Sequence, residues 1–274
     1  MSNCFNSLIK FFKKISPEIS RYFIIQGLKE NWREKIRKDS RPYWLKKISS
    51  KLTIRYVNRF IRPQFKSLGK GPVFFKPWYI KLFGSNISVG NFPTFISAPD
   101  DYIQITSWDT GDWNGKVDIG NYVLISPGVR IMAADSVSIG DSCMFGHGAC
   151  ITDADWHGIY DRTKVVGDPR PVVLEENVWI GEDAMICKGV KIGANSIIGA
   201  RSVVTKDIPK NTIYAGNPAV FIRDLDENEF ITREDFFQDP VKLAKDFDLL
   251  DRYTLGQNSF LGWIKSMIFR DKSH

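Results

Sequence analysis

Long apolar runs are missing from this 274-residue sequence. None of its hydrophobic stretches approaches the ~20 residues that a membrane-spanning helix needs. The first segment also lacks the uninterrupted apolar core of a secretion signal, because Lys10, Lys13 and Lys14 interrupt its hydrophobic residues. Without a span or a signal, the chain is expected to stay in the cytoplasm, where it is made.

Residues that bind metals or form disulfides are few. The sequence has three histidines, His147, His157 and His274, and the last of these is its final residue. The cysteines show no C-x-x-C spacing, and they are Cys4, Cys143, Cys150 and Cys187. We therefore expect a reduced compartment and no bound metal. Walker and Rossmann glycine motifs are also missing, which argues against a nucleotide held in either of those ways.

Acidic residues are scarce in the first part of the chain. Residues 1–82 hold 20 Lys and Arg against 4 Asp and Glu, a net charge of +16, whereas the remainder holds 18 against 27, a net charge of −9. This asymmetry predicts that the first segment meets an anionic partner. Anionic lipid, an acidic glycan and a nucleotide-diphosphate sugar would each satisfy that charge, and no nucleic-acid partner is expected.

What the sequence does contain is a hydrophobic period of six. Five aliphatic residues stand six apart: Ile180, Ile186, Ile192, Ile198 and Val204. Small or β-branched residues follow each of them by four positions: Ala184, Val190, Ser196, Ser202 and Ile208. A period of six fits neither an amphipathic helix, near 3.6, nor a flat strand, at 2. It predicts a β-solenoid whose coils have three flat faces, with one hexad on each face.

The same period occurs earlier in two shorter registers. One contains Ile119, Ile125 and Ile131, and the other contains Ile139, Phe145 and Ile151. The two registers differ by two residues, which a small bulge around residues 133–137 would absorb. Val89 and Phe95 are expected to mark a ragged first coil.

Three stretches resemble a known family, the hexapeptide-repeat acyltransferases. They are residues 151–157 (ITDADWH), 177–182 (NVWIGE) and 214–219 (YAGNPA) running on to Arg223. The resemblance is to the branch with galactoside, maltose and xenobiotic O-acetyltransferases and the O-antigen and capsule acetyltransferases. It implies a mainly β fold, a left-handed parallel β-helix over residues 83–223. The handedness comes from the family, since a period of six does not set it.

The segments on either side of the solenoid read as helical. Residues 1–82 form a basic, largely helical segment, with helices expected over 5–38, and residues 224–274 form a helical extension that is expected to cover the open end of the coil stack. The stretch 260–269 is apolar with basic flanks, which suits peripheral binding to an anionic membrane. Packing on the domain or on a neighbouring subunit explains the same pattern.

The repeat breaks for nearly thirty residues, and residues 152–177 are expected to form a protruding functional loop. The loop contains His157, and the resemblance implies that this histidine is the general base. Asp155 or Asp153 is expected to orient its imidazole, and the sequence does not choose between them. His147 lies within a coil, where a surface or interface role is expected.

The resemblance also implies a groove for acetyl-CoA between two subunits of a homotrimer. The residues that it assigns to the donor are Trp179, Gly181, Glu182, Ala200, Thr205, Lys206 and Arg223. Ala200 and Thr205 match main-chain contacts, and Lys206 matches a phosphate-facing position. Some relatives have serine where this chain has Glu182, so that contact differs.

The acceptor side departs from the galactoside enzymes of the family. Ser126 stands where they carry an asparagine that contacts sugar, and Ala134 stands where they carry an aspartate. A simple galactoside is therefore not the expected acceptor. Ser126, Tyr160 and Arg162 are candidates for a sugar site, as are residues 108–113. An ordinary loop explains the stretches 108–113 and 160–162 equally well.

The expected activity is transfer of an acetyl group from acetyl-CoA to a hydroxyl of a saccharide or glycolipid intermediate of cell-envelope polysaccharide. Direct attack needs no acyl-enzyme, because no Cys or Ser pairs with a base in the sequence. Two alternatives stay open: an N-acyltransferase acting on an amino sugar, and a non-catalytic saccharide-binding scaffold. The γ-type carbonic anhydrases share the solenoid but hold zinc with three histidines, and only two histidines lie in this one.

Overall fold

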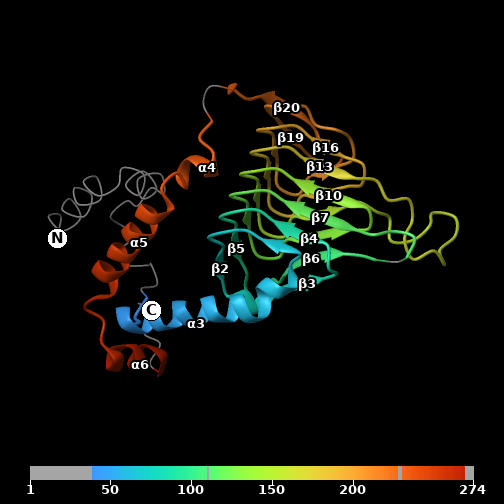
Figure 1. Ribbon diagram of the computed structural model, residues 1–274. Coiled ribbons are helices and arrows are strands. Elements are labelled where there is room, and N and C mark those ends of the chain that lie inside the picture. The colour runs from blue at the N-terminus through green and yellow to red at the C-terminus, as the bar shows by residue number, and fades with distance from the viewer. Residues whose placement is uncertain (1–38, 110, 228–229, 269–274) are drawn as a thin grey trace. The chain divides into compact units, whose positions relative to one another are not determined.

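Figure 1 shows the computed structural model of the protein, which describes residues 39–109, 111–227 and 230–268. The chain divides into two compact units. Of the described residues, those between 53 and 237 form the larger unit, and 39–52 together with 238–268 form the smaller one. The helices expected over 5–38 lie outside the described residues.

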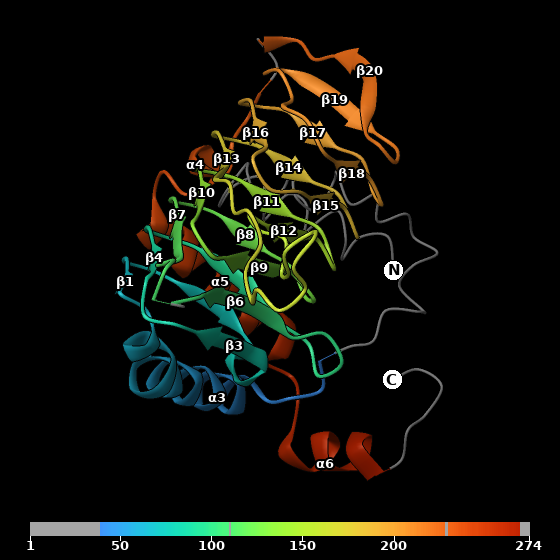
Figure 2. The same cartoon turned by 90° about the vertical axis from the view of Figure 1, so that its right-hand side faces the viewer.

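The larger unit is a parallel β-helix with three faces, each of which is one sheet (Figures 1 and 2). The first sheet contains β1 (Ser67–Leu68), β4 (Ile87–Val89), β7 (Lys116–Ile119), β10 (Ser136–Ile139), β13 (Val172–Leu174) and β16 (Lys191–Ile192). The second contains β2 (Val73–Phe75), β5 (Thr94–Ile96), β8 (Leu124–Ile125), β11 (Met144–Phe145), β14 (Trp179–Ile180), β17 (Ile197–Ile198), β19 (Thr212–Ala215) and β20 (Val220–Asp224). The third contains β3 (Ile80–Phe83), β6 (Ile103–Ser107), β9 (Arg130–Ala133), β12 (Cys150–Thr152), β15 (Met185–Ile186) and β18 (Val203–Val204).

The residues that repeat every six positions point into the coils and stack on one another. Ile125 pairs in register with Phe145, and Phe145 pairs with Ile180. These three side chains are at most 1% exposed. Ile131 and Ile151 form the corresponding pair in the third sheet. Burying one such side chain stabilises the fold by about 1.5–3 kcal/mol relative to leaving it exposed. The period of six therefore predicted this core correctly.

Asparagines form a ladder at the corner between the first and second sheets. The amide of Asn177 donates to Asn195 Oδ1 at 2.9 Å, and that of Asn195 donates to Asn211 Oδ1 at 2.8 Å. All three residues have φ between 56° and 62°. Asparagine tolerates this left-handed conformation better than most residues, so the chain turns there without needing glycine at each coil.

A complete coil precedes residue 83, where the sequence led us to expect the solenoid to begin. Strands β1, β2 and β3 pair with β4, β5 and β6 of the next coil. Val57, Ile61 and Phe65 are buried in the same core as this first coil. Helix α3 (Tyr43–Tyr56) leads into the turns η2 (Val57–Ile61) and η3 (Arg62–Gln64). Val57 and Ile61 belong to η2, and Phe65 directly follows η3. A further turn, η4 (Pro77–Tyr79), joins β2 to β3.

The C-terminal extension begins by returning along the side of the coils, whereas we expected it to cover their open end. Helix α4 (Arg233–Phe236) brings the guanidinium of Arg233 within 2.6 Å of the Tyr122 carbonyl and 3.0 Å of Thr94 Oγ1. The Phe237 ring stacks on Phe92 and Tyr122. Antiparallel strand β20 instead extends the second sheet at that end.

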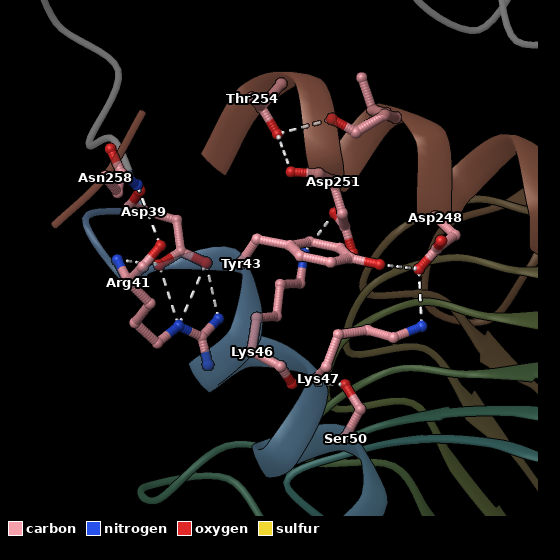
Figure 3. A network of polar contacts seen from close by, with 11 residues as sticks. Asp39, Arg41, Tyr43, Lys46, Lys47, Ser50, Asp248, Asp251, Thr254 and Asn258 are labelled. Carbon is pink, nitrogen blue, oxygen red and sulfur yellow. Dashed lines mark hydrogen bonds and ion pairs between the residues drawn. The ribbon is translucent and has the colours of Figure 1, made fainter. Parts of the chain in front are cut away.

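The smaller unit is held together by a polar network between α3 and helix α5 (Pro240–Leu255) (Figure 3). Asp248 accepts from Tyr43 Oη at 2.8 Å and from Lys47 Nζ at 2.6 Å, and Asp251 accepts from Lys46 Nζ at 2.5 Å. The hydrogen bond from Lys47 is the main reason that the pKa of Asp248 falls to about 2. Helix α6 (Phe260–Ile268) follows. In the described part of the chain, every helix is too short or too polar to span a bilayer.

Candidate functional site

The longest excursion from the coils joins β12 to β13 and leaves the solenoid where the third sheet passes to the first (Figure 1). We call this edge the loop corner. The excursion ends at β13, earlier than residue 177, and its two arms are joined by hydrogen bonds. The N–H of Gly167 donates to the Asp155 carbonyl at 2.6 Å, and the N–H of Arg170 donates to the Asp153 carbonyl at 2.7 Å. These two hydrogen bonds close the base of the loop.

His157 lies exposed on this loop, and the surrounding backbone assigns its tautomer. Its Nδ1 is 3.2 Å from the carbonyl oxygen of Lys164. A carbonyl oxygen only accepts hydrogen bonds, so the bond requires a proton on Nδ1. In a neutral ring, Nε2 then has a free lone pair. This is the arrangement that a general base needs.

Neither carboxylate that we expected to orient His157 forms a hydrogen bond with its ring. Asp155 Oδ2 instead accepts from Lys188 Nζ at 2.6 Å. Asp153 is buried and accepts from the N–H groups of Ala134 and Asp135, each at 2.8 Å. Burial raises the pKa of the Asp153 carboxyl, and these two hydrogen bonds oppose the rise. Both aspartates therefore anchor the base of the loop, and the backbone carbonyl of Lys164 takes the place of the expected carboxylate partner.

Replacing Lys188 with methionine is expected to loosen the loop. The ammonium donates to Asp155 Oδ2 and to the Asp168 carbonyl, at 2.6 Å and 2.7 Å, and methionine makes neither bond. The loss of about 1–3 kcal/mol should speed hydrogen exchange at the Gly167 amide by about fivefold to 150-fold. Lys191→Met, which removes an exposed ion pair with Glu175, is the control and should leave that amide unchanged. Equal exchange in both variants would contradict the anchoring role of Lys188.

Aromatic residues gather beside the histidine. The Trp108 and Trp156 ring centroids are 5.7 Å apart, and those of Phe83 and Trp108 are 5.1 Å apart. Trp156 Nε1 is buried without a hydrogen-bond partner among the described residues. The sequence drew attention to residues 108–113 but missed Phe83 and Trp156. The position of Trp156 directly before His157 was the available signal.

The proposed donor and acceptor residues divide between two corners of the solenoid. Thr205 and Lys206 follow β18 at the loop corner, on the same edge as His157. Gly181, Glu182, Ala200 and Ser126 follow strands of the second sheet, at the corner where that sheet passes to the third; we call this the opposite corner. There, a Cβ on Gly181 would lie 2.6 Å from the backbone N of Ala200, so only glycine fits.

The remaining candidates lie on exposed surfaces. The Trp179 side chain is exposed on β14, and Arg223 is exposed on β20, where its Nη1 donates to the Asp224 carbonyl at 3.3 Å. Tyr160 is fully exposed on the loop, and Arg162 is exposed beside it. One copy of the chain therefore brings His157, Tyr160 and Arg162 together on the loop, but it does not bring them to Ser126.

Comparison with known proteins identifies the family. A family model described as "Bacterial transferase hexapeptide (six repeats)" matches residues 171–206. A galactoside O-acetyltransferase of Lactococcus lactis is 30% identical over 174 residues, which cover 63% of this chain and 69% of that protein. The chain belongs to the hexapeptide-repeat transferase family. It is accordingly an acyltransferase, and its coils form the left-handed β-helix that the resemblance implied.

Two further proteins are similar to this chain. A putative colanic acid biosynthesis acetyltransferase of Escherichia coli is 28% identical over 114 residues, covering 42% of this chain and 62% of that one. Among solved structures, an N-acyltransferase from Bacillus cereus, in complex with dTDP and 3-hydroxybutyryl-CoA, superimposes with a TM-score of 0.51. It is 20% identical and covers 70% of this chain and 96% of its own, so it shows the shared fold.

The other solenoid histidine of this transferase, His147, is paired at the opposite corner. Its Nε2 is 3.1 Å from Asp101 Oδ2, and both side chains are nearly half exposed. That hydrogen bond, with Glu182 and Asp183 nearby, raises the pKa of His147. No group of three His, Cys, Asp or Glu side chains that could hold a metal ion occurs in residues 39–109, 111–227 and 230–268.

Replacing Asp101 with asparagine is expected to lower the pKa of His147 toward the ordinary value of about 6.5. In the parent protein, the ion pair stabilises the fold below that pH, and its contribution disappears as the pH rises through the raised pKa. The contribution is at most about 1 kcal/mol, because the pair is exposed to solvent. An NMR titration of the His147 ring measures the pKa directly. An unchanged value in the variant would show that Asp101 is not the cause.

Proposed function

We propose that the protein transfers an acetyl group from acetyl-CoA to a hydroxyl group of a saccharide or glycolipid intermediate in cell-envelope polysaccharide synthesis. The observation that carries the proposal is the bond between His157 Nδ1 and the Lys164 carbonyl, which leaves Nε2 free to accept a proton. The reaction is proposed to take place in the cytoplasm, where acetyl-CoA is present.

The proposed chemistry is direct attack. Nε2 of His157 accepts the proton of the acceptor hydroxyl as its oxygen forms a bond to the thioester carbon. The resulting oxyanion is stabilised by hydrogen-bond donors of the groove. The carbon–sulfur bond then breaks, and the leaving thiolate takes the proton from Nε2. Throughout, the Lys164 carbonyl keeps the ring in one orientation and stabilises the imidazolium that forms.

The donor site is proposed to lie between two copies of the chain in a homotrimer. Support comes from the division of the candidate residues: Thr205 and Lys206 share the loop corner with His157, whereas Glu182 and Ala200 lie at the opposite corner. Two copies packed side by side can join one corner of each into a single groove. Lys206 and Arg223 would then supply positive charge for the phosphates of coenzyme A.

Two kinds of support point to the acceptor: the names of the similar proteins and the residues of this chain. The relatives include enzymes named for galactosides, for colanic acid and for lipopolysaccharide. Trp108, whose ring contacts that of Trp156, offers an aromatic face, and Tyr160 and Arg162 of the His157 loop offer a phenol and a cation, which together suit the apolar faces and hydroxyls of a sugar.

An assay of coenzyme A release tests this function. Purified protein is incubated with acetyl-CoA and a panel of saccharides and lipid-linked intermediates, and acetylated products are identified by mass spectrometry. We expect acceptor-dependent thioester consumption, with an O-acetyl ester as the product. Failure to bind acetyl-CoA in calorimetry would contradict the donor assignment. An amide product would show that the enzyme is an N-acyltransferase and not an O-acetyltransferase.

A further inference from the structure

Residues 43–52 of helix α3, together with helix α6, lie in the smaller unit and carry an apolar surface that no described residue covers. On α3, Trp44, Ile48 and Leu52 recur every four residues and are 51%, 47% and 55% exposed. This spacing places them along one side of the helix. Exposed apolar residues arranged contiguously mark interaction surfaces more often than isolated ones do.

Helix α6 extends this surface. Six of its nine residues are apolar, and four are strongly exposed: Phe260, Leu261, Met267 and Ile268. The Phe260 ring lies 6.0 Å from that of Trp44. The Asn258 side chain holds α6 beside the start of α3 by donating to the carbonyls of Asp39 and Arg41, at 2.7 Å and 3.0 Å. Together the exposed apolar residues of the two helices form one surface, which we call the α3–α6 face: Trp44, Ile48, Leu52, Phe260, Leu261, Met267 and Ile268.

Free positive charge lies among these apolar residues. Neither α3 nor α6 contains Asp or Glu. Lys51 and Arg55 fall on the same side of α3 as Trp44 and Ile48, and neither makes an ion pair within the described part of the chain. Lys265 of α6 is exposed as well.

The acidic residues in the described part of the smaller unit do not offset this charge, because each of them is in an ion pair, caps a helix or is buried. Asp39, Asp248 and Asp251 are in ion pairs with Arg41, Lys47 and Lys46. Asp239 caps α5 by accepting from the Lys242 N–H, and Asp246 is buried. The charge left over on the α3–α6 face is therefore positive.

We propose that the α3–α6 face docks this enzyme onto the surface of an anionic lipid bilayer. Aromatic and aliphatic side chains enter the boundary between headgroups and acyl chains, and lysine and arginine among them meet lipid phosphates. The complementary charge is the reason for choosing a membrane over a second copy of this basic segment, which would repel it. The inference does not depend on the acetyl-transfer proposal.

Vesicle sedimentation of the full chain tests the proposal. One set of vesicles contains phosphatidylcholine alone, and in the other phosphatidylglycerol replaces a third of it. We expect binding to the anionic vesicles that weakens with added salt, because free ions screen the lysine and arginine charges. Absence of binding by the parent protein, or equal binding to both vesicles, would overturn the proposal.

Two pairs of substitutions locate the binding surface. Ile48→Ser with Leu261→Ser should lower the partition coefficient by about tenfold or more, because two apolar side chains no longer leave water. Lys51→Glu with Arg55→Glu should lower it by at least about fivefold for each residue. The matched controls are Val220→Ser with Ile222→Ser, which are 57% and 54% exposed on β20, and Lys66→Glu with Lys70→Glu.

Light scattering and circular dichroism accompany these measurements. The variants should keep the parent's number of subunits and its thermal unfolding, because every substituted side chain is exposed. Binding that survives in the α3–α6 variants, or that falls equally in the controls, would show that the membrane contact lies elsewhere. A change in the number of subunits with vesicle binding retained would make this face a contact between copies and overturn the proposal.

Discussion

His157→Ala is expected to lower kcat for acetyl transfer by a factor of about 10²–10⁴, the usual contribution of a positioned general base. The variant cannot accept the hydroxyl proton, so the attacking oxygen stays a poor nucleophile. KM for acetyl-CoA should change little, because the imidazole acts on the acceptor hydroxyl and not on the donor's phosphates. Steady-state assays with each substrate varied in turn separate the two effects.

The matched control for this prediction is His147→Ala. His147 is also an exposed histidine of the solenoid, but it is paired with Asp101 at the opposite corner. Its replacement should leave kcat within about threefold of the parent value, since no proton transfer is assigned to it. If His157→Ala retained full activity, or if His147→Ala lost as much as His157→Ala, the assignment of the base would be wrong.

Ile105→Ala is expected to lower the free energy of unfolding by about 2–5 kcal/mol. Ile105 is fully buried in β6, in register with Leu82 of the preceding coil and Ile131 of the next. A cavity there removes contacts with both neighbours, and the single-file core of a solenoid offers few side chains to fill it. Urea denaturation followed by circular dichroism gives the free energy.

Gln104→Ala provides the comparison, because Gln104 precedes Ile105 in the same strand and its side chain points out of the coil. Truncating this exposed side chain should change the free energy of unfolding by no more than about 0.5 kcal/mol. Similar losses in the two variants would mean that the inward and outward positions have been assigned incorrectly.

The sequence was sufficient to predict the solenoid because the physical constraint is periodic. Every coil buries its inward residues against those above and below, so the period of six recurs wherever coils stack. Leu68 and Phe74 follow the same spacing in the first coil, where they pair in register with Val89 and Phe95. They went unrecognised because Leu82, which pairs in register with Ile105, stands eight positions after Phe74 and not six, so the phase is lost at that turn.

The loop was harder to predict because its contacts are not periodic. The partner of His157 is a backbone carbonyl, which every residue possesses and which no sequence pattern reveals. Asp155 was near the histidine in sequence, yet it bonds to Lys188, which is 33 residues away and lies on the next coil. The contact between Trp108 and Trp156 likewise joins two excursions from different coils.

The structure of the complex with acetyl-CoA tests the central claim most directly. The thioester is expected to lie along a groove between two subunits. Its carbonyl carbon should be close enough to Nε2 of His157 for the acceptor oxygen to fit between them. Nδ1 of His157 should keep its hydrogen bond to the Lys164 carbonyl. A donor bound on a face remote from this loop, or a His157 ring turned away from the groove, would contradict the account.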